Sequence, residues 1–188
     1  MSRLIYSYLV SLDGYVADKD GGFGWARPDE EVLAFINALE APIRSYLYGR
    51  RMYEMMKGWE LDSQYAAMSD GSADFAKIWS AAEKIVYSTS LHDIATTKTR
   101  LKSSFDADEI RRLKMDAPTD IAIGGATLAA HALKAGLVDE IHAFIAPIIV
   151  GGGLAMFPPD LRLSLTLTDE RRFQNGMTFV RYDVHTPS

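Results

Sequence analysis

Short apolar runs alternate with amphipathic segments along most of the chain. The apolar runs have the length and bounding turn residues of β-strands, and the amphipathic segments repeat apolar residues at helical spacing. The predicted strands are residues 3–12, 45–48, 84–88, 120–123, 140–149, 163–168 and 178–184. The predicted helices are residues 30–40, 51–57, 73–82, 107–114 and 126–135. Strands that alternate with helices predict a mostly parallel sheet covered on both faces.

Local start and stop signals support several of these helices. Asp29, Ser72 and Asp106 each precede a predicted helix, where a short polar side chain can accept a hydrogen bond from a free amide of the first turn. Gly136 follows the last predicted helix and suits a C-cap. These residues predict where helices begin and end.

The C-terminal end of the sheet should be antiparallel. The last two predicted strands are joined without a helix through the turn sequence Asn175-Gly176. Residues 58–72 are polar and predict an irregular surface loop. No repeat or linker divides the chain, so we expect residues 1–188 to form one α/β domain.

Composition and charge narrow the classes of function. The 20 Lys and Arg residues against 25 Asp and Glu residues give a formal charge of −5, so we expect neither a nucleic-acid nor an anionic membrane partner. The absence of cysteine excludes disulfides and Cys-based zinc sites and suits the cytoplasm. No two of the 4 histidines stand at a helical ligand spacing, so we expect no structural metal. The apolar residues 4–12 lack a small-residue cleavage site and favour a first strand over a signal peptide.

One predicted strand passes through two glycines directly into a helix. Gly124 and Gly125 follow this strand, and Ala126 and Thr127 begin the helix. Glycine lets a ligand approach the backbone closely, and the free amides of a helix N-terminus bind anions. The same glycines could instead serve only a tight turn. Because the full Gly-x-Gly-x-x-Gly pattern is missing, both interpretations stay open.

A second predicted strand is followed by Gly49, and then by Arg50, Arg51 and Met52 at the start of a helix. Two guanidinium groups beside helix-terminal amides suit a phosphate, because each guanidinium can donate two hydrogen bonds. The alternative is that the arginines pair with Glu54 or another surface acid. The residue types alone do not decide between these roles.

Two further loops follow predicted strands. Ser88, Thr89 and Ser90 could hold a sugar or phosphate, although such residues more often form turns or caps. Residues 11–30 form a glycine-rich loop with aromatic residues that could close over a substrate. The acids at its end begin a helix, where negative charge is favourable without any catalytic role.

These segments together resemble the dihydrofolate reductase superfamily, and most closely its branch with the RibD C-terminal reductase domain of riboflavin biosynthesis. The resemblance covers nearly the whole chain and depends on the order and spacing of four motifs. The motifs are Ser-Leu-Asp-Gly-Tyr-Val-Ala at 11–17, Tyr-Gly-Arg-Arg-Met-Tyr-Glu at 48–54, Ile-Gly-Gly-Ala-Thr-Leu at 123–128, and Val-Asp-Glu-Ile at 138–141 with Gly-Gly-Gly-Leu-Ala-Met-Phe-Pro at 151–158.

The resemblance implies a three-layer sandwich and the cofactor NADPH. In this superfamily the Gly-Gly turn receives the pyrophosphate, and the Gly-Arg helix start and the hydroxyl-rich strand end receive the adenosine half with its 2′-phosphate. The implied cofactor residues are Gly49, Arg50, Arg51, Met52, Ser88, Thr89, Ser90, Gly124, Gly125, Ala126 and Thr127.

The resemblance also suggests residues for the substrate side. Trp25, Pro28 and Glu30 follow the Trp-x-x-Pro-x-Asp pattern of dihydrofolate reductases, whose acid binds the pterin, although Glu stands here in place of Asp. Glu30 then takes the acid role, with Trp25 and Asp29 as substrate-binding neighbours. In riboflavin-type reductases the acid at the position of Asp13 lies near cofactor and substrate, so Asp13 is a second catalytic candidate.

The proton-donor hypothesis for Glu30 makes structural expectations. Trp25 and Phe35 should wall its carboxyl group and partly remove it from water, which would raise its pKa. Asp29 should cap the helix and Glu31 should face solvent. The alternative is that all three acids only stabilise the N-terminus of the helix and have no catalytic role.

The sequence therefore predicts an NADPH-dependent reductase. It would transfer hydride to a pterin, to a pyrimidine of the 5-amino-6-ribosylaminouracil phosphate type, or to a related small substrate. The alternative is a catalytically inactive NADP-binding module. Related riboflavin-branch reductases are commonly homodimers. The apolar segment 140–150 and the sheet edge supplied by the hairpin that ends in Tyr182 agree with a homodimer.

Overall fold

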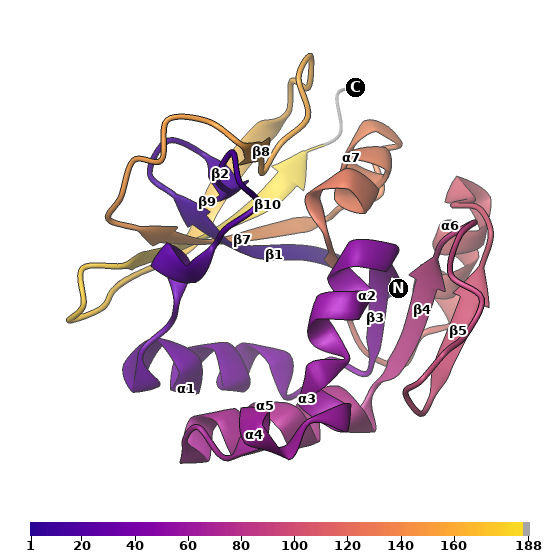
Figure 1. Ribbon diagram of the computed structural model, residues 1–188. Coiled ribbons are helices and arrows are strands. Elements are labelled where there is room, and N and C mark those ends of the chain that lie inside the picture. Colours follow the sequence, from indigo (N-terminus) through magenta and orange to yellow (C-terminus); the bar gives the residue numbers. More distant parts are fainter. Residues whose placement is uncertain (186–188) are drawn as a thin grey trace.

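The apolar segments form the strands of the computed structural model, which describes residues 1–185 (Figure 1). The strands are β1 (Leu4–Ser11), β2 (Tyr15–Ala17), β3 (Ser45–Gly49), β4 (Glu83–Tyr87), β5 (Thr99–Lys102), β6 (Ile121–Gly124), β7 (Glu140–Ala146), β8 (Leu154–Ala155), β9 (Ser164–Arg172) and β10 (Thr178–His185). The helices are α1 (Glu30–Glu40), α2 (Arg50–Met56), α3 (Gly58–Leu61), α4 (Ser63–Ala66), α5 (Asp70–Ala81), α6 (Ala107–Asp116) and α7 (Ala126–Lys134), with a 3-10 turn η1 (Gly24–Ala26).

Within the described residues, eight strands form one sheet in the order β5-β4-β3-β6-β1-β7-β10-β9. The neighbours from β5 to β7 in this order pair in parallel. β10 pairs antiparallel with both β7 and β9. The predicted mostly parallel sheet with antiparallel C-terminal strands is therefore confirmed. β2 and β8 form a small separate sheet.

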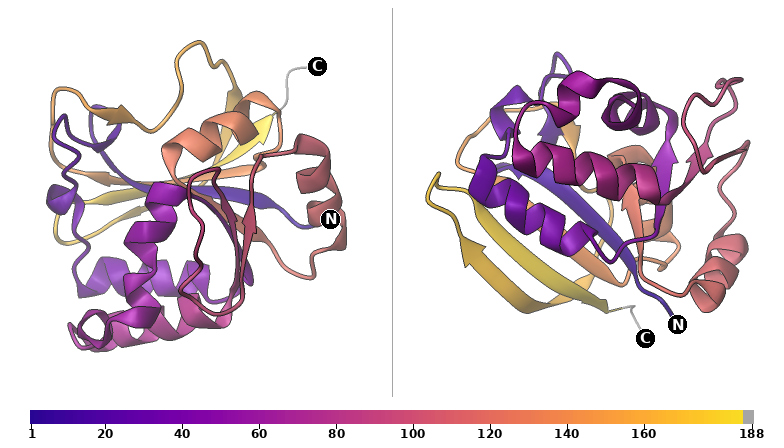
Figure 2. Two further views of the ribbon diagram at one scale, coloured as in Figure 1. Left: turned by 45° about the vertical axis from the view of Figure 1, so that its right-hand side comes forward. Right: turned by 90° about the horizontal axis from the view of Figure 1, so that it is seen from below.

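Alternate residues of each central strand point to opposite sides of the sheet. Both faces are therefore apolar, and helices cover both. On one side, Leu4 and Tyr6 of β1 join a core with residues of α6 and α7. On the other side, Ile5 joins a core with Trp79 of α5, and α1 packs against an aromatic cluster of β7 and β10. The right-hand view of Figure 2 shows α1 and α5 together on this second face. The result is the expected three-layer sandwich.

Several predicted helix ends are confirmed. Asp29 Oδ1 accepts a hydrogen bond from Val32 N at 3.0 Å, and Asp106 Oδ1 accepts one from Asp108 N at 2.9 Å. Gly136 has a φ of 64°, as a left-handed C-cap requires. The Ser72 cap is wrong, because α5 begins earlier and Ser69 Oγ accepts from Ser72 N at 3.1 Å.

Residues 58–72 are not the irregular loop that their polarity predicts. They form α3, α4 and the first residues of α5. The Trp59 ring contacts Tyr65 and Phe75 edge-on, with centroids 5.2 and 4.7 Å apart. This aromatic cluster stabilises the segment through contacts with α5 that local polarity does not reveal.

Three strands were not predicted, and one predicted strand is too long. β5 is short and polar, and β2 and β8 have only 3 and 2 residues. β7 ends at Ala146 because Pro147 has no amide hydrogen to continue the ladder. Within the described residues, no helix combines the length and hydropathy needed to cross a membrane.

Candidate functional site

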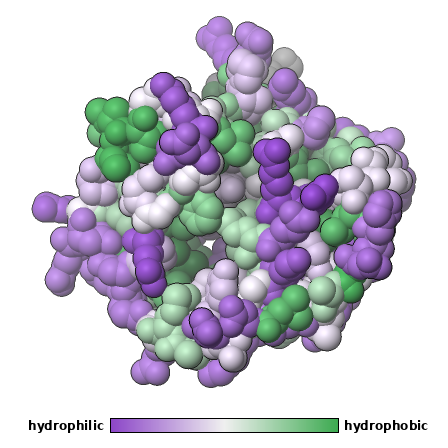
Figure 3. Space-filling model, in the orientation of Figure 1, coloured by the Kyte–Doolittle hydropathy of each residue, from purple (hydrophilic) through white to green (hydrophobic). Residues whose placement is uncertain are grey.

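A large cleft opens at the carboxyl ends of β3, β4 and β6 and continues along the sheet face that α1 covers. Figure 3 shows the molecule hollowed near the centre of the view. The cleft volume is 2040 Å³. One drug-sized ligand typically occupies a pocket of roughly 300 to 1,000 Å³. The cleft therefore has room for two bound molecules.

The cleft has two halves with different linings. We call the first the outer half, formed by residues 49–52, 88–90, 103–105, 124–127 and 131. Many of its side chains are exposed. We call the second the inner half, formed by Leu33, Ile36, Glu40, Tyr46, Met55, Met56, Phe75 and Phe144. None of these eight side chains is fully exposed, and four are buried.

All eleven residues predicted to bind the cofactor line the outer half. They come from the start of α2, the end of β4 and the turn between β6 and α7. The strands β4, β3 and β6 are neighbours and run parallel, so their carboxyl ends meet at one edge of the sheet. Ligands bind at such edges in open α/β sheets.

The turn before α7 requires both of its glycines. A Cβ on Gly124 would lie 2.7 Å from the ring of Tyr48, and Gly125 has a φ of +93°. Gly125 is also the N-cap of α7 and offers no side chain to its amides. Tight turn geometry therefore demands glycine, and the same turn leaves amides free for an anion.

The two arginines lie at the exposed edge of the outer half. Arg50 Nε lies 3.0 Å from Glu54 Oε1, and its NH1 donates to Ser90 Oγ at 2.9 Å. The alternative of pairing with Glu54 is therefore confirmed for Arg50. Within residues 1–185, the Arg51 guanidinium makes no ion pair. An exposed ion pair contributes only about 0 to 1 kcal/mol, so Arg50 can exchange Glu54 for an anion at little cost.

Of the hydroxyl residues after β4, Ser88 forms turn hydrogen bonds and Ser90 contacts another segment. Ser88 Oγ accepts from the amides of Ser90 and Leu91 at 3.1 and 3.0 Å, which is the common turn role. Ser90 Oγ instead accepts from Arg50. This hydrogen bond joins the segment after β4 to the start of α2.

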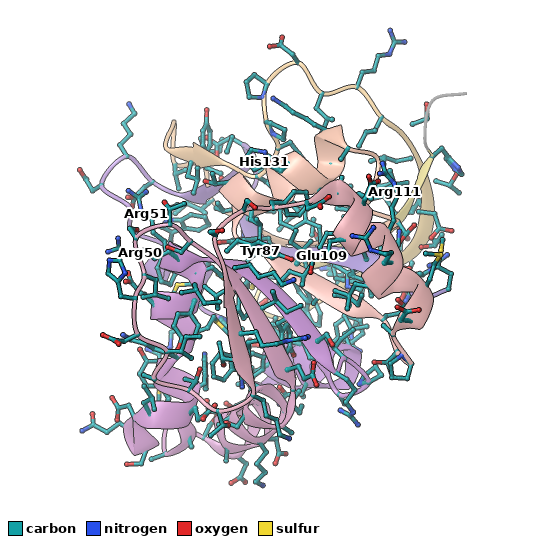
Figure 4. All side chains as sticks on the ribbon, turned by 90° about the vertical axis from the view of Figure 1, so that its right-hand side faces the viewer. Arg50, Arg51, Tyr87, Glu109, Arg111 and His131 are labelled. Atoms are coloured by element: carbon teal, nitrogen blue, oxygen red, sulfur yellow. The ribbon has the colours of Figure 1, made fainter. Side chains whose placement is uncertain are left out.

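The sequence did not reveal a second group in the outer half, formed by Tyr87, Phe105 and His131. Their rings follow one another, with centroids 5.6 Å apart for Tyr87 and Phe105 and 6.1 Å for Phe105 and His131. Figure 4 shows His131 on α7, Tyr87 below it, and Arg50 and Arg51 to one side. The Tyr87 hydroxyl is buried without a hydrogen-bond partner among the described residues, and burial raises its pKa to about 12. Recognising β5 would have drawn attention to Phe105, which follows its carboxyl end.

The four residues predicted for catalysis and substrate binding do not line the cleft. Glu30 is exposed, with its Oε2 beside Gly71 at the start of α5. The predicted wall of Trp25 and Phe35 around its carboxyl is wrong, because Phe35 packs with Phe144, Phe173 and Phe179 instead. Trp25 Nε1 donates to Gly22 O at 3.2 Å.

The acids next to Glu30 have structural partners. Asp29 caps α1, as expected. Glu31 does not simply face solvent, because its Oε2 accepts from Gln174 N at 3.0 Å and its Oε1 lies 3.4 Å from Arg171 NH2. These contacts connect α1 to the end of β9 and to the turn that follows it.

Asp13 joins two loops. Its carboxylate accepts hydrogen bonds from Ser11 Oγ at 2.7 Å, Val150 N at 3.1 Å and Gly151 N at 2.8 Å. The bond from Ser11, with those from the two amides, holds the pKa of Asp13 below its ordinary value. An acid with a lowered pKa is ionised near neutral pH and is poorly suited to donate a proton.

The inner half contains an acid that the sequence did not single out. Glu40 ends α1 and lines the cleft, and its Oε2 accepts a hydrogen bond from Tyr46 OH at 2.9 Å. Burial raises the pKa of Glu40, although the Tyr46 hydrogen bond and the nearby His142 partly oppose this shift. Carboxyl groups whose pKa is shifted by burial and specific neighbours are found preferentially at functional sites.

Two aromatic rings of β3 in the cleft lining stack on each other. Tyr46 and Tyr48 lie parallel, with centroids 5.5 Å apart and planes 9° apart. Trp79 Nε1 donates to Tyr48 OH at 3.1 Å and fixes the second ring. Among the described residues, no three His, Asp or Glu side chains form a cluster that could hold a metal ion.

Comparisons with known proteins identify the family of this chain. The sequence model of the RibD C-terminal domain matches residues 2–179. The uncharacterized protein YyaP of Bacillus subtilis is 27% identical over 187 residues, which cover 96% of this chain and 94% of that protein.

Two solved structures share the fold. A putative riboflavin biosynthesis protein from Shewanella has a TM-score of 0.76 at 23% identity and covers 98% of this chain and 99% of its own. A pyrimidine reductase-like protein from Corynebacterium diphtheriae has a TM-score of 0.70 at 16% identity and covers 99% of this chain and 93% of its own. With the family match over nearly the whole length, these findings show that the chain belongs to the RibD C-terminal domain family.

Proposed function

We propose that this protein is an NADPH-dependent reductase of a small pterin, pyrimidine or related substrate. The observation that carries the proposal is the convergence of three separate segments, predicted from their motifs, on the outer half of one cleft. Membership of the RibD C-terminal domain family supports the reductase class. The names of the Shewanella and Corynebacterium proteins point to pyrimidine chemistry and riboflavin biosynthesis.

The residues of the outer half fit a phosphorylated dinucleotide. The free amides before α7 suit the pyrophosphate, because they present N–H groups at the positive end of a nine-residue helix. Arg50 and Arg51 suit the 2′-phosphate, which distinguishes NADPH from NADH. The unpartnered Tyr87 hydroxyl among the described residues would gain a hydrogen-bond partner from a polar ligand.

The inner half would hold the substrate against the cofactor. When bound, NADPH supplies a hydride. The apolar side chains around Phe75 and Phe144 exclude water from the substrate and align it with the outer half. The chain itself would contribute orientation, a dry environment and a proton-holding group.

The second candidate function is a nucleotide-binding module without turnover. The observation that favours it is that Glu30, Asp13, Trp25 and Asp29 all lie outside the cleft lining. Oxidation of NADPH with any substrate would exclude this candidate.

Titration with NADPH and NADH, followed by a turnover screen with dihydrofolate and the riboflavin precursor, tests both candidates. We expect NADPH to bind more tightly than NADH and one substrate class to be reduced. Tighter binding of NADH, or no binding of either, would contradict the proposal.

We also propose a homodimer through the β9 edge of the sheet. β9 is exposed along almost its whole length. Leu165 and Leu167 lie on the same face of this strand, with 41% and 46% of their surface exposed. An exposed edge strand with apolar side chains favours pairing with another chain. Light scattering at micromolar concentration should give the mass of a dimer, and a monomeric mass would contradict this assembly.

A further inference from the structure

Apolar side chains from two helices form much of the lining of the inner half. Met55 and Met56 come from α2, and Met55 is only partly buried. Leu33 and Ile36 come from α1. Methionine is flexible and polarisable, so it adapts to apolar ligands of different shape. This part of the cleft therefore suits the apolar part of a ligand.

Aromatic side chains of α3, α4 and α5 extend this apolar lining. Trp59 and Tyr65 also line the cleft, and the Trp59 ring contacts Tyr65 and Phe75 edge-on. All three residues are only partly buried. A ligand that covers this remaining apolar surface gains free energy, because the surface is removed from water.

Charged side chains are distributed unevenly along the cleft. Within residues 1–185, the Lys and Arg residues that line it are Lys19, Arg27, Arg50 and Arg51, and none belongs to the inner half. Arg50 and Arg51 lie in the outer half, whereas Lys19 and Arg27 are exposed between β2 and α1. Glu40 is the one charged residue among the eight that form the inner half.

An anionic group in the inner half would meet no cation from the described residues of that half. Removing a phosphate or carboxylate group from water is costly unless a cation or several hydrogen-bond donors replace the water. The Tyr46 hydroxyl already donates to Glu40 at 2.9 Å, and Trp79 Nε1 already donates to Tyr48. Ionised Glu40 would add repulsion between like charges.

We propose that the substrate enters the inner half without a phosphate or carboxylate group, so that uncharged members of the substrate class are selected over anionic relatives. This inference rests on the proposed function, because it places the cofactor in the outer half and the substrate in the inner half. Because Met55 is partly buried in this lining, a cation in its place should supply the missing partner for an anion.

The first test is calorimetric titration near neutral pH of the full chain saturated with NADP+, which keeps Arg50 and Arg51 occupied. One pair of probes is 6-methylpterin and pterin-6-carboxylate, which carry a methyl group or a carboxylate on the same ring. The other pair is 5-amino-6-ribitylaminouracil and its 5′-phosphate. We expect the uncharged member of each pair to bind at least about tenfold more tightly, the scale of one missing hydrogen bond to a charged group.

Tighter binding of either anionic probe, or equal affinities within a pair, would overturn the inference. A chain that binds neither uncharged probe would overturn it as well. If the chain binds neither NADPH nor NADP+, the proposed function fails, and titration without cofactor still compares the members of each pair. If NADPH binds normally and an anionic probe is preferred, the proposed function stands and only this inference fails.

The second test places a cation in the inner half. Met55→Lys exchanges one unbranched side chain for another and should tighten binding of the anionic probes about 10- to 150-fold, the range for hydrogen bonds to a charged group. Met115→Lys is the matched control, because Met115 of α6 is exposed and outside the cleft lining, and it should leave all affinities unchanged. Unchanged selectivity in folded Met55→Lys would overturn the inference.

Circular dichroism and NADPH titration check that each variant keeps its fold and its cofactor site. If Met55→Lys does not fold, Ile36→Lys places the cation on α1 in the same half of the cleft. Its control is Ala38→Lys, at an exposed position of the same helix outside the cleft lining. The same gain for anionic probes is expected in Ile36→Lys and not in Ala38→Lys, and an equal response of the two variants would overturn the inference.

Discussion

The outer and inner halves of the cleft differ in how the chain builds them. Apart from His131 of α7, the outer half consists of strand ends and the residues that follow them, so most of its functional groups lie in short sequence segments and many are exposed. The inner half consists of side chains from α1, β3, α2, α5 and β7, and four of the eight residues that form it are buried. The outer half offers amides and guanidinium groups, whereas the inner half offers apolar surface and one carboxyl group.

This difference separates two kinds of recognition. Exposed cations and free amides recognise phosphate groups, which many nucleotides share. Glu40, the one carboxyl group of the inner half, instead accepts a hydrogen bond from Tyr46 among apolar side chains, where an unpaired polar group is costly. We therefore expect substitutions in the outer half to change cofactor binding and substitutions in the inner half to change substrate binding, with little exchange between them.

The largest effect should come from Gly125→Val. A β-branched residue at a φ of +93° is strained by about 1 to 3 kcal/mol, and its side chain would approach Met52 and block the turn. Titration should show binding of NADPH and NADH lost together. Gly176→Val, at a φ of +87° in the β9–β10 turn, should be strained similarly yet bind both cofactors. Loss of one cofactor alone in Gly125→Val would contradict a shared pyrophosphate site.

The next largest effect should be a difference between the affinities for NADPH and NADH. Arg50→Ala and Arg51→Ala should each weaken NADPH binding by about 1.5 to 3 kcal/mol, the range for hydrogen bonds to charged groups, and NADH binding much less. Fluorescence titration of both cofactors measures the difference. Arg111→Ala on α6 changes an arginine outside the cleft and should have no effect. An equal loss of affinity for NADPH and NADH would contradict the assignment of Arg50 and Arg51 to the 2′-phosphate.

In the inner half, the ionised carboxyl group of Glu40 should lower the stability of the folded protein. Because the folded-state pKa of Glu40 is raised, the folded protein binds more protons than the unfolded chain, and stability falls as pH rises from the ordinary glutamate pKa of 4.5 through the raised value. Glu40→Gln removes this loss and should unfold at a higher temperature than the wild type at pH 8, with a smaller difference at pH 4. A lower unfolding temperature at pH 8 would mean that the carboxylate stabilises the fold.

The smallest effect should come from Glu30→Gln. Its carboxyl group is exposed outside the cleft, and such substitutions change free energies by about 0.5 kcal/mol or less, roughly twofold in rate. Single-turnover hydride transfer, once a substrate is known, measures this effect beside Glu40→Gln. A large loss in Glu30→Gln with an altered pH profile would restore the proton-donor hypothesis based on the dihydrofolate reductase pattern.

Local signals predicted much of the fold and the outer half. The bounds of α1 agree with the prediction because Asp29 caps it, and the parallel sheet follows from strands that alternate with helices. The segment 58–72 could not be predicted, because contacts of Trp59 with Tyr65 and Phe75 stabilise it and its composition is polar.

The sequence by itself determined where strands end and which residues follow them, since turns and caps depend on neighbouring residues. Only the tertiary structure decided which carboxyl group enters the cleft. Glu30 and Glu40 stand at opposite ends of α1, about 15 Å apart for ten residues of helix. Glu30 faces solvent and lies beside the start of α5, whereas Glu40 accepts a hydrogen bond from Tyr46 in the inner half. Burial and partners depend on packing between distant segments, and these set the pKa and the role of a carboxyl group.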